Sequence, residues 1–175
     1  MVAKTTAEPW PAAGQVFTVD DLDGMPDDGR RYELVDGVLM VSPHPSVAHQ
    51  AVLSEVAVQL HHACPPGLFA VPAPGLRMSA DTELIPDVVI IRHDQLAGRR
   101  VTRPPLLAVE IESPSSALFD PNTKKAVYER FSIPSYWIVV PDVDLPELDF
   151  DPPLLACGTS PPLRRRPVHK HTTCS

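Results

Sequence analysis

Two short apolar runs in the middle of the chain carry acidic residues at positions that a β-sheet would bury. The first run, residues 85–91, places Asp87 directly before four consecutive β-branched residues. The second run, residues 106–112, contains Glu110 and Glu112, which are two positions apart and would share one side of a strand. A charged group in an apolar strand is costly unless it is paired or binds a metal. The pattern therefore predicts two neighbouring strands that present three carboxylates.

The remaining hydrophobic pattern predicts strands and helices in alternation. Residues 32–41 form two β-like runs around Asp36-Gly37, a strong hairpin signal. Ser46 can cap a helix that runs to about Ala63 with apolar residues at the 3.6-residue period. A second helix is expected over residues 121–131, and a strand of high β propensity over residues 136–140. We expect an α/β (α+β) fold with a mixed central sheet flanked by helices.

The length of 175 residues corresponds to one domain. Residues 1–15 are expected to be a disordered lead, and residues 16–142 to form the domain. Residues 143–175 lack a sustained apolar pattern, are rich in proline and end in a basic segment, so we interpret them as a loose tail. A truncated or reading-frame-altered C-terminus is a hypothesis for this tail.

Composition narrows the class of protein. The 22 prolines argue against a bundle of long helices. No stretch reaches the roughly 18 apolar residues of a membrane span, and no signal peptide is visible. The three cysteines are scattered, which fits a reducing cytosol better than a disulfide framework. With a net charge of −7, the chain does not favour unspecific adhesion to nucleic acid, so any such binding needs local basic groups, a metal or a partner subunit.

The carboxylates and one lysine suggest phosphodiester chemistry. Three carboxylates on neighbouring strands would form a site for a hard cation such as Mg²⁺. Such an ion polarises a phosphate and activates water, while Lys124 could stabilise the developing charge. The competing interpretation is that these acids are strand-end residues that are solvated or paired with arginine.

Several stretches of the chain together resemble a known family. The order Pro86-Asp87, then Glu110-Ile111-Glu112, is similar to the PD-(D/E)xK nuclease signature. More narrowly, residues 16–142 resemble the Uma-type putative restriction endonuclease family of bacteria. The stretches that carry this resemblance are residues 31–37, 42–50, 86–89, 109–115, 120–124, 128–130 and 133–137.

The resemblance implies a restriction-endonuclease-like fold with an Mg²⁺-dependent site. Asp87 matches the metal-binding Asp of the family, and Glu110 matches the acid of the second half-motif. The simple signature would place a lysine two residues after Glu110, where this chain has Glu112. The lysine is then expected from the following helix, which indicates Lys124, with Lys125 as the competing choice.

Three further residues match the family pattern. Glu33 corresponds to an acid that such folds direct at the metal; its alternative is a partner for Arg30 or Arg31. His49 is a candidate for a phosphate contact or for supporting a metal ligand. Asp120 lies four residues before Lys124 and could orient it, or it could simply cap the helix.

The sequence thus predicts a cytoplasmic, metal-dependent endonuclease that acts on DNA with Mg²⁺, or Mn²⁺ as a substitute. Asp87, Glu110 and Glu112 are the predicted metal ligands, and Lys124 and Glu33 complete the catalytic set. A homodimer is plausible because cutting both strands commonly requires two active sites. The alternatives are a non-catalytic nuclease-fold binding protein and a metal-dependent hydrolase of a small phosphoester.

Overall fold

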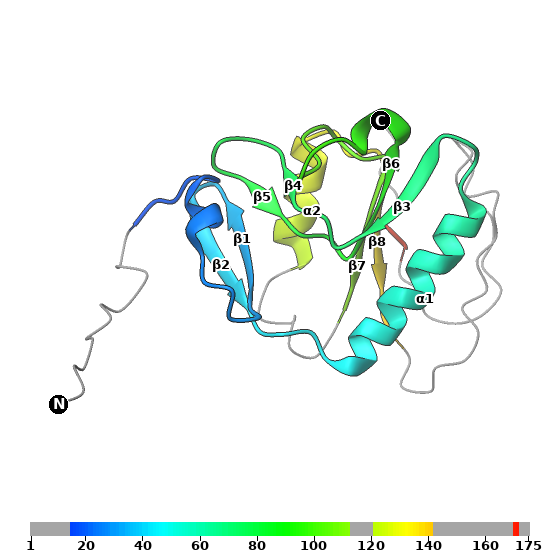
Figure 1. Cartoon of the computed structure of the whole chain (residues 1–175), viewed down its shortest axis with the longest axis horizontal. Helices are drawn as coiled ribbons and strands as arrows, with labels where there is room; N and C mark the ends of the chain where they lie inside the picture. The colour runs from blue at the N-terminus through cyan, green and yellow to red at the C-terminus, as the bar shows by residue number, and fades with distance from the viewer. Residues whose placement is uncertain (1–14, 113–120, 142–169, 172–175) are drawn as a thin grey trace.

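A computed structural model describes residues 15–112, 121–141 and 170–171 of the chain. The described residues form two β-sheets and two α-helices (Figure 1). Residues 1–14 of the predicted disordered lead and nearly all of the predicted tail fall outside them, so these expectations stay predictions. No helix among the described residues combines the length and apolarity that crossing a membrane requires.

The larger sheet has five strands in the order β3-β6-β7-β8-β9. Its central strands are the two acid-bearing runs, which pair antiparallel as neighbours, while β7 and β8 pair in parallel. The prediction that these runs are adjacent strands is confirmed. The strands are β3 (Leu68–Pro72), β6 (Val88–Arg92), β7 (Leu107–Ile111), β8 (Tyr136–Val139) and β9 (Lys170–His171).

The predicted hairpin forms, but it belongs to a separate, smaller sheet of the order β2-β1-β5-β4. Its turn residues Asp36 and Gly37 both adopt positive φ, as the tight Asp-Gly turn requires. The small sheet consists of β1 (Arg31–Val35), β2 (Val38–Ser42), β4 (Leu76–Arg77) and β5 (Glu83–Leu84). The predicted α/β fold with a mixed central sheet flanked by helices is confirmed by the five-stranded sheet, and the hairpin lies in a second sheet beside it.

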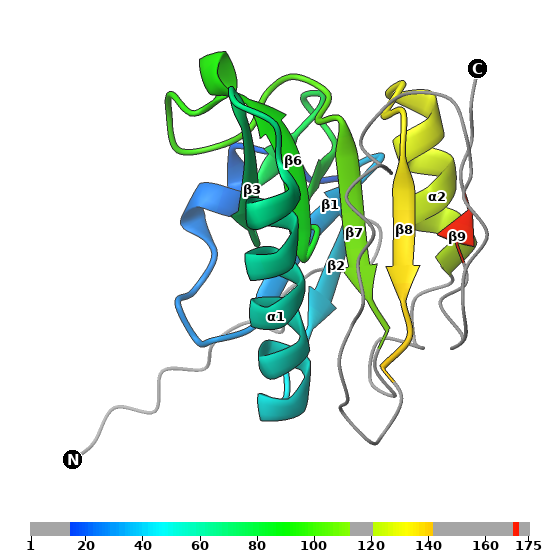
Figure 2. The ribbon, with the colours of Figure 1, turned by 90° about the vertical axis from the view of Figure 1, so that its right-hand side faces the viewer.

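The two faces of the large sheet are covered by different elements (Figure 2). Helix α1 (Val47–Ala63) packs its apolar side chains against Val88, Ile90 and Val109, and its N-cap is Ser46, as predicted. Helix α2 (Pro121–Arg130) packs on the other face, together with residues of the small sheet. Because both faces are covered, β6 and β7 read as continuous apolar runs rather than alternating ones. An acid on the α2 face of these strands is consequently enclosed between the two sheets and α2.

Candidate active site

Strand register places Asp87 and Glu110 beside each other. Val88 pairs with Val109 in the antiparallel ladder, so Asp87 and Glu110 occupy the next step, where β6 begins and β7 nears its end. Asp87 Oδ2 accepts a hydrogen bond from the backbone N–H of Ile111 at 2.7 Å. Asp87 and Glu110, one from each of the two apolar runs, therefore lie beside each other on adjacent strands.

Asp87 is buried and held by two further donors. Arg31 Nη1 from β1 and His49 Nε2 from α1 both contact its Oδ1, at 3.0 and 3.1 Å. Burial alone would raise the pKa of Asp87, but the hydrogen bonds from His49 and Ile111 and the charge of Arg31 outweigh it, so the pKa lies below its usual value. Asp87 is thus ionised at neutral pH, with its orientation fixed from three directions.

Lys124 joins the two sheets through a pair of carboxylates. Its Nζ lies 3.0 Å from Glu110 Oε1 on β7 and 3.0 Å from Glu33 Oε1 on β1. Burial lowers the pKa of Lys124, but the two carboxylates outweigh burial and the pKa lies above its usual value. Lys125 turns away and pairs with Glu129 at 3.3 Å near the protein surface. Of the two candidate lysines, the helix therefore directs Lys124 into the cluster of acids.

Tyr128 holds Glu110 from a second side. Its buried hydroxyl donates to Glu110 Oε1 at 2.6 Å, and it follows Lys124 by one helical turn. Burial, with the negative charges of Asp87 and Glu33, raises the pKa of Glu110 to about 7, against the opposing influence of Lys124 and Tyr128. Glu110 therefore holds its proton more tightly than a solvent-exposed glutamate does.

Most of the predicted site residues converge. Glu33 is buried and accepts hydrogen bonds from Lys124 and from the backbone N–H of Ile85, rather than pairing with Arg30 or Arg31. Glu112 follows the end of β7, is exposed, and makes no side-chain hydrogen bond or ion pair with another described residue. Asp120 lies outside the described residues, so its expected role stays a prediction.

Two members of the cluster were not assigned a role from the sequence. The sequence indicates Arg31 only as an alternative partner for Glu33, but Arg31 contacts Asp87, which is 56 positions away. Tyr128 was part of a family-like stretch, and its spacing of four from Lys124 is the signal that could have placed it on the same helix face.

The chemistry of the cluster suits a hard divalent cation. Three carboxylates face two permanent cations, Arg31 and Lys124, so the ionised cluster retains negative charge. Among the described residues, Glu110 uses only Oε1 for hydrogen bonds and Asp87 Oδ2 accepts only one, which leaves oxygen lone pairs for an ion. Within the same residues, however, no three acidic, histidine or cysteine side chains are arranged around one metal position. The donors fit Mg²⁺, and in the arrangement shown Arg31 and Lys124 offset part of the negative charge of the acids.

Another buried acid, Glu83, illustrates a purely structural arrangement. Its two oxygens bind Arg77 Nε at 2.6 Å and Arg100 Nε at 2.7 Å. Both arginines also bind the N-terminal segment, with Arg77 donating to the carbonyl of Val19 and Arg100 contacting Asp23. Both carboxylate oxygens of Glu83 thus bind arginines that hold the N-terminal segment in place. In Glu110, by contrast, only Oε1 makes hydrogen bonds to other described residues.

The fold is that of a nuclease-like protein. A crystal structure described as a putative nuclease belonging to DUF820 from Anabaena variabilis ATCC 29413 superposes with a TM-score of 0.60 at 17% identity, covering 71% of this chain and 74% of the other. Residues 19–145 match the Uma2 family model, described as "Putative restriction endonuclease", and the chain belongs to that family. None of the curated protein sequences is similar enough to count as a match.

Proposed function

We propose that this chain is a metal-dependent endonuclease that hydrolyses phosphodiester bonds in DNA. The observation that supports the proposal most is the placement of Lys124 between Glu110 and Glu33, within the same enclosed cluster as Asp87. A lysine next to paired carboxylates suits hydrolysis of a phosphate diester, because both the attacking group and the transition state are anionic. Membership in the Uma2 family agrees with this chemistry.

Asp87 and Glu110 would hold the metal, Mg²⁺ or Mn²⁺, and Glu33 or Glu112 would add an oxygen or bind a water molecule. When bound, the ion polarises the scissile phosphate and lowers the pKa of the attacking water. The chain's own residues then have distinct tasks. Lys124 stabilises negative charge on the hydroxide or phosphate, Glu33 orients Lys124, and Arg31 and His49 hold Asp87 in place.

A non-catalytic nuclease-fold binding protein is the second candidate. It is favoured by the ion pairs and hydrogen bonds that join the buried acids to Arg31, His49 and Lys124, and by the acidic net charge of the chain. A protein that only binds would need neither a metal nor Lys124 for its function. Metal dependence therefore separates the two candidates.

The decisive experiment is cleavage of supercoiled plasmid by the full chain in Mg²⁺, Mn²⁺ or EDTA. We expect nicked or linear product with either metal and none in EDTA. Asp87→Ala and Lys124→Ala should each lower the cleavage rate by at least about 100-fold, as loss of a charge-stabilising group typically does. Lys125→Ala removes the neighbouring, surface-paired lysine and should leave the rate within about twofold.

The outcomes distinguish the candidates. Absence of metal-dependent cleavage by the wild type, or cleavage that survives both substitutions, would refute the endonuclease. Metal binding by calorimetry without cleavage would favour the binding protein. A homodimer, which cleavage of both strands would use, is tested by sedimentation of the same preparation.

A further inference from the structure

Arg31 uses only one of its three guanidinium nitrogens within the cluster of acids. Its Nη1 donates to Asp87 Oδ1 at 3.0 Å and to the carbonyl of Ile85 at 3.4 Å. Its Nε and Nη2 make no hydrogen bond or ion pair with another described residue. Because no buried side-chain nitrogen or oxygen of the described residues lacks a hydrogen-bond partner, these two nitrogens are accessible to solvent. Arg31 therefore has a free edge of donors beside Asp87.

Exposure divides the charged side chains of the cluster into two groups. The side chains of Arg31, Lys124 and Glu110 are 17%, 15% and 14% exposed. The other members are buried more deeply, with side chains that are at most 8% exposed: Asp87, Glu33 and His49. Solvent, and with it a substrate, therefore reaches the cluster at two cations and one carboxylate.

Strand β1 directs Arg31 toward the same acids that Lys124 contacts. Arg31 and Glu33 are two positions apart on this strand and share one of its faces. The face presents Glu33 to Lys124 and Arg31 to Asp87. The carboxylates of Glu33 and Glu110 attract the guanidinium from farther away, but neither forms an ion pair with it. The free edge of Arg31 is thus not neutralised by a second acid.

We propose that the free edge of Arg31 binds a non-bridging oxygen of the scissile phosphate, so that Arg31 and Lys124 act on this phosphate together. A planar guanidinium edge matches the oxygens of a phosphate, and it stays charged at any pH the protein meets. The inference rests on the proposed function and makes Arg31 a residue that touches the substrate, in addition to its contact with Asp87. A fixed cation at that position stabilises charge that develops on the phosphate.

A role limited to holding Asp87 predicts a different response to substitution. Without Arg31, Asp87 still has hydrogen bonds from His49 and from the backbone N–H of Ile111. Removing a cation beside a metal ligand also removes repulsion toward a divalent ion. Arg31→Met should therefore bind Ca²⁺ at least as tightly as the wild type but bind DNA more weakly. If Arg31 only positioned Asp87, Ca²⁺ binding would weaken and DNA binding would be normal once Ca²⁺ is saturating.

The test measures metal binding, DNA binding and cleavage separately on the full chain. Calorimetry gives the Kd for Ca²⁺, and fluorescence anisotropy gives the Kd for a short labelled duplex in saturating Ca²⁺, with a gel to check that the duplex stays intact. Arg31→Met should weaken the duplex Kd about tenfold and reduce the slope of log K against log salt by about 0.9, the value for one phosphate contact. Its rate of plasmid cleavage in Mg²⁺ should fall about 100-fold.

Arg31→Lys keeps a positive charge for Asp87 and tests the guanidinium edge itself. It should recover part of the duplex affinity, yet cleave at least about tenfold more slowly than the wild type, because an ammonium group lacks the planar fork. Circular dichroism checks that the variants are folded. If Arg31→Met does not fold, Arg31→Lys carries the test, and wild-type cleavage by this variant would overturn the proposal.

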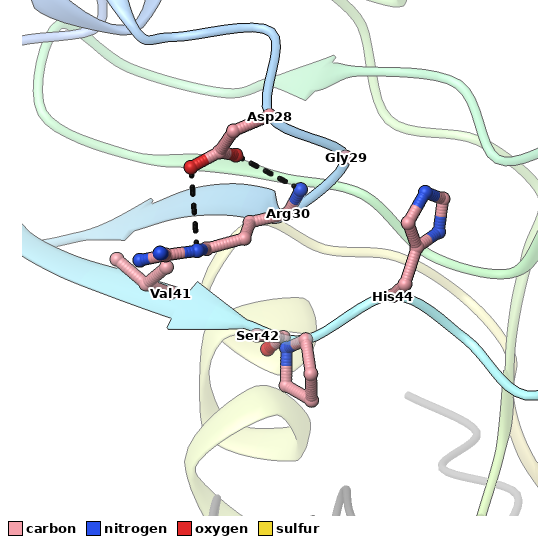
Figure 3. Close-up of a pocket in the computed structure, with 7 residues that line it drawn as sticks. Asp28, Gly29, Arg30, Val41, Ser42 and His44 are labelled. Carbon is pink, nitrogen blue, oxygen red and sulfur yellow. Dashed lines mark hydrogen bonds and ion pairs between the residues drawn. The ribbon is translucent and has the colours of Figure 1, made fainter.

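Arg30→Met is the matched control, because Arg30 is the adjacent cation and alternation directs it away from Arg31. Its guanidinium is paired with Asp28 at 3.3 Å and is directed toward Val41 (Figure 3). Arg30→Met should change the duplex Kd and the cleavage rate less than about twofold.

The outcomes separate this proposal from the endonuclease itself. Equal losses for Arg30→Met and Arg31→Met, no duplex binding by the wild type, or weaker Ca²⁺ binding with normal duplex binding by Arg31→Met would overturn the phosphate contact. If the wild type cleaves plasmid and Arg31→Met cleaves equally well, the contact fails while the endonuclease stands. If the wild type never cleaves but Arg31→Met lowers the salt slope, the endonuclease fails while the contact stands.

Discussion

Glu33 and Lys124 lie 91 positions apart in the sequence, yet Lys124 Nζ donates to Glu33 Oε1 at 3.0 Å. Glu33 belongs to the small sheet and Lys124 to the helix that covers the large sheet. The same ammonium group contacts Glu110 on β7, so one side chain connects three elements. The stability of the fold and the chemistry of the candidate site therefore depend on the same residue.

Removing this ammonium group should destabilise the protein. Lys124→Ala leaves Glu33 and Glu110 largely buried without their cation, which we expect to cost about 3 kcal/mol of unfolding free energy. Lys125→Ala should cost less than about 0.5 kcal/mol, because its ion pair is near the surface. Urea unfolding in EDTA measures both values, and equal stability of the two variants would show that the buried pair contributes little.

Loss of the Tyr128 hydroxyl should make Glu110 harder to ionise while leaving its carboxyl group in place. Tyr128→Phe deletes the 2.6 Å hydrogen bond that favours ionised Glu110, so the pKa of Glu110 should rise further. We expect about a tenfold lower cleavage rate at pH 7, the cost of one hydrogen bond to a charged group, and partial recovery at higher pH. Rates of plasmid cleavage between pH 6 and 9 test this.

Tyr136→Phe is the control for that substitution, since its ring packs against Tyr128 with centroids 4.9 Å apart. It should leave the pH profile unchanged. A pH profile that shifts equally in both variants would mean that the effect comes from ring packing.

The raised pKa of Glu110 should make stability depend on pH. Its pKa is about 7 in the folded state and 4.5 in the unfolded chain, so the folded state binds the proton more tightly. The stability that this proton supplies is complete below pH 4.5 and is lost as pH rises toward 7. Glu110→Gln should therefore gain stability relative to the wild type between pH 5 and pH 8 in EDTA, as measured by urea unfolding. A constant difference across this range would contradict the raised pKa.

Glu83 should be important for folding but not for cleavage. Glu83→Ala leaves Arg77 and Arg100 without their buried partner and loosens the N-terminal segment, so we expect a loss of about 3 kcal/mol. The cleavage rate per folded molecule should stay within about twofold, because Glu83 contacts arginines outside the candidate site. Glu55→Ala, on the exposed side of α1, is the control for removal of a carboxylate. A strong loss of activity in folded Glu83→Ala would give this acid a role in the site.

Local patterns were sufficient to predict most of the elements. The Asp36-Gly37 turn located the hairpin, and Ser46 with the apolar period located α1. The two apolar runs also predicted that Asp87 and Glu110 would lie on neighbouring strands. These features depend on residues that are close in sequence or on simple periodicity.

The contacts between the two sheets could not be read from such patterns. The small sheet closes through β5, which has only two residues and is too short for a periodic signal. Arg31 contacts Asp87 only because that sheet packs beside β6, and Glu112 is exposed because β7 ends one residue earlier. In each case tertiary packing, rather than local preference, decides which charged groups meet.

The parallel pairing of β7 and β8 determines which face of the sheet the lysine-bearing helix between them covers. Parallel neighbours require a crossover connection, and crossovers strongly prefer one hand, which determines the face of the sheet that the connecting helix covers. Here α2 covers the face that carries Glu110, the same face to which alternation assigns position 112. The crossover thus puts a helix over the face that carries Glu110, so this chain can place glutamate at 112 and still deliver an ammonium group to Glu110 from position 124.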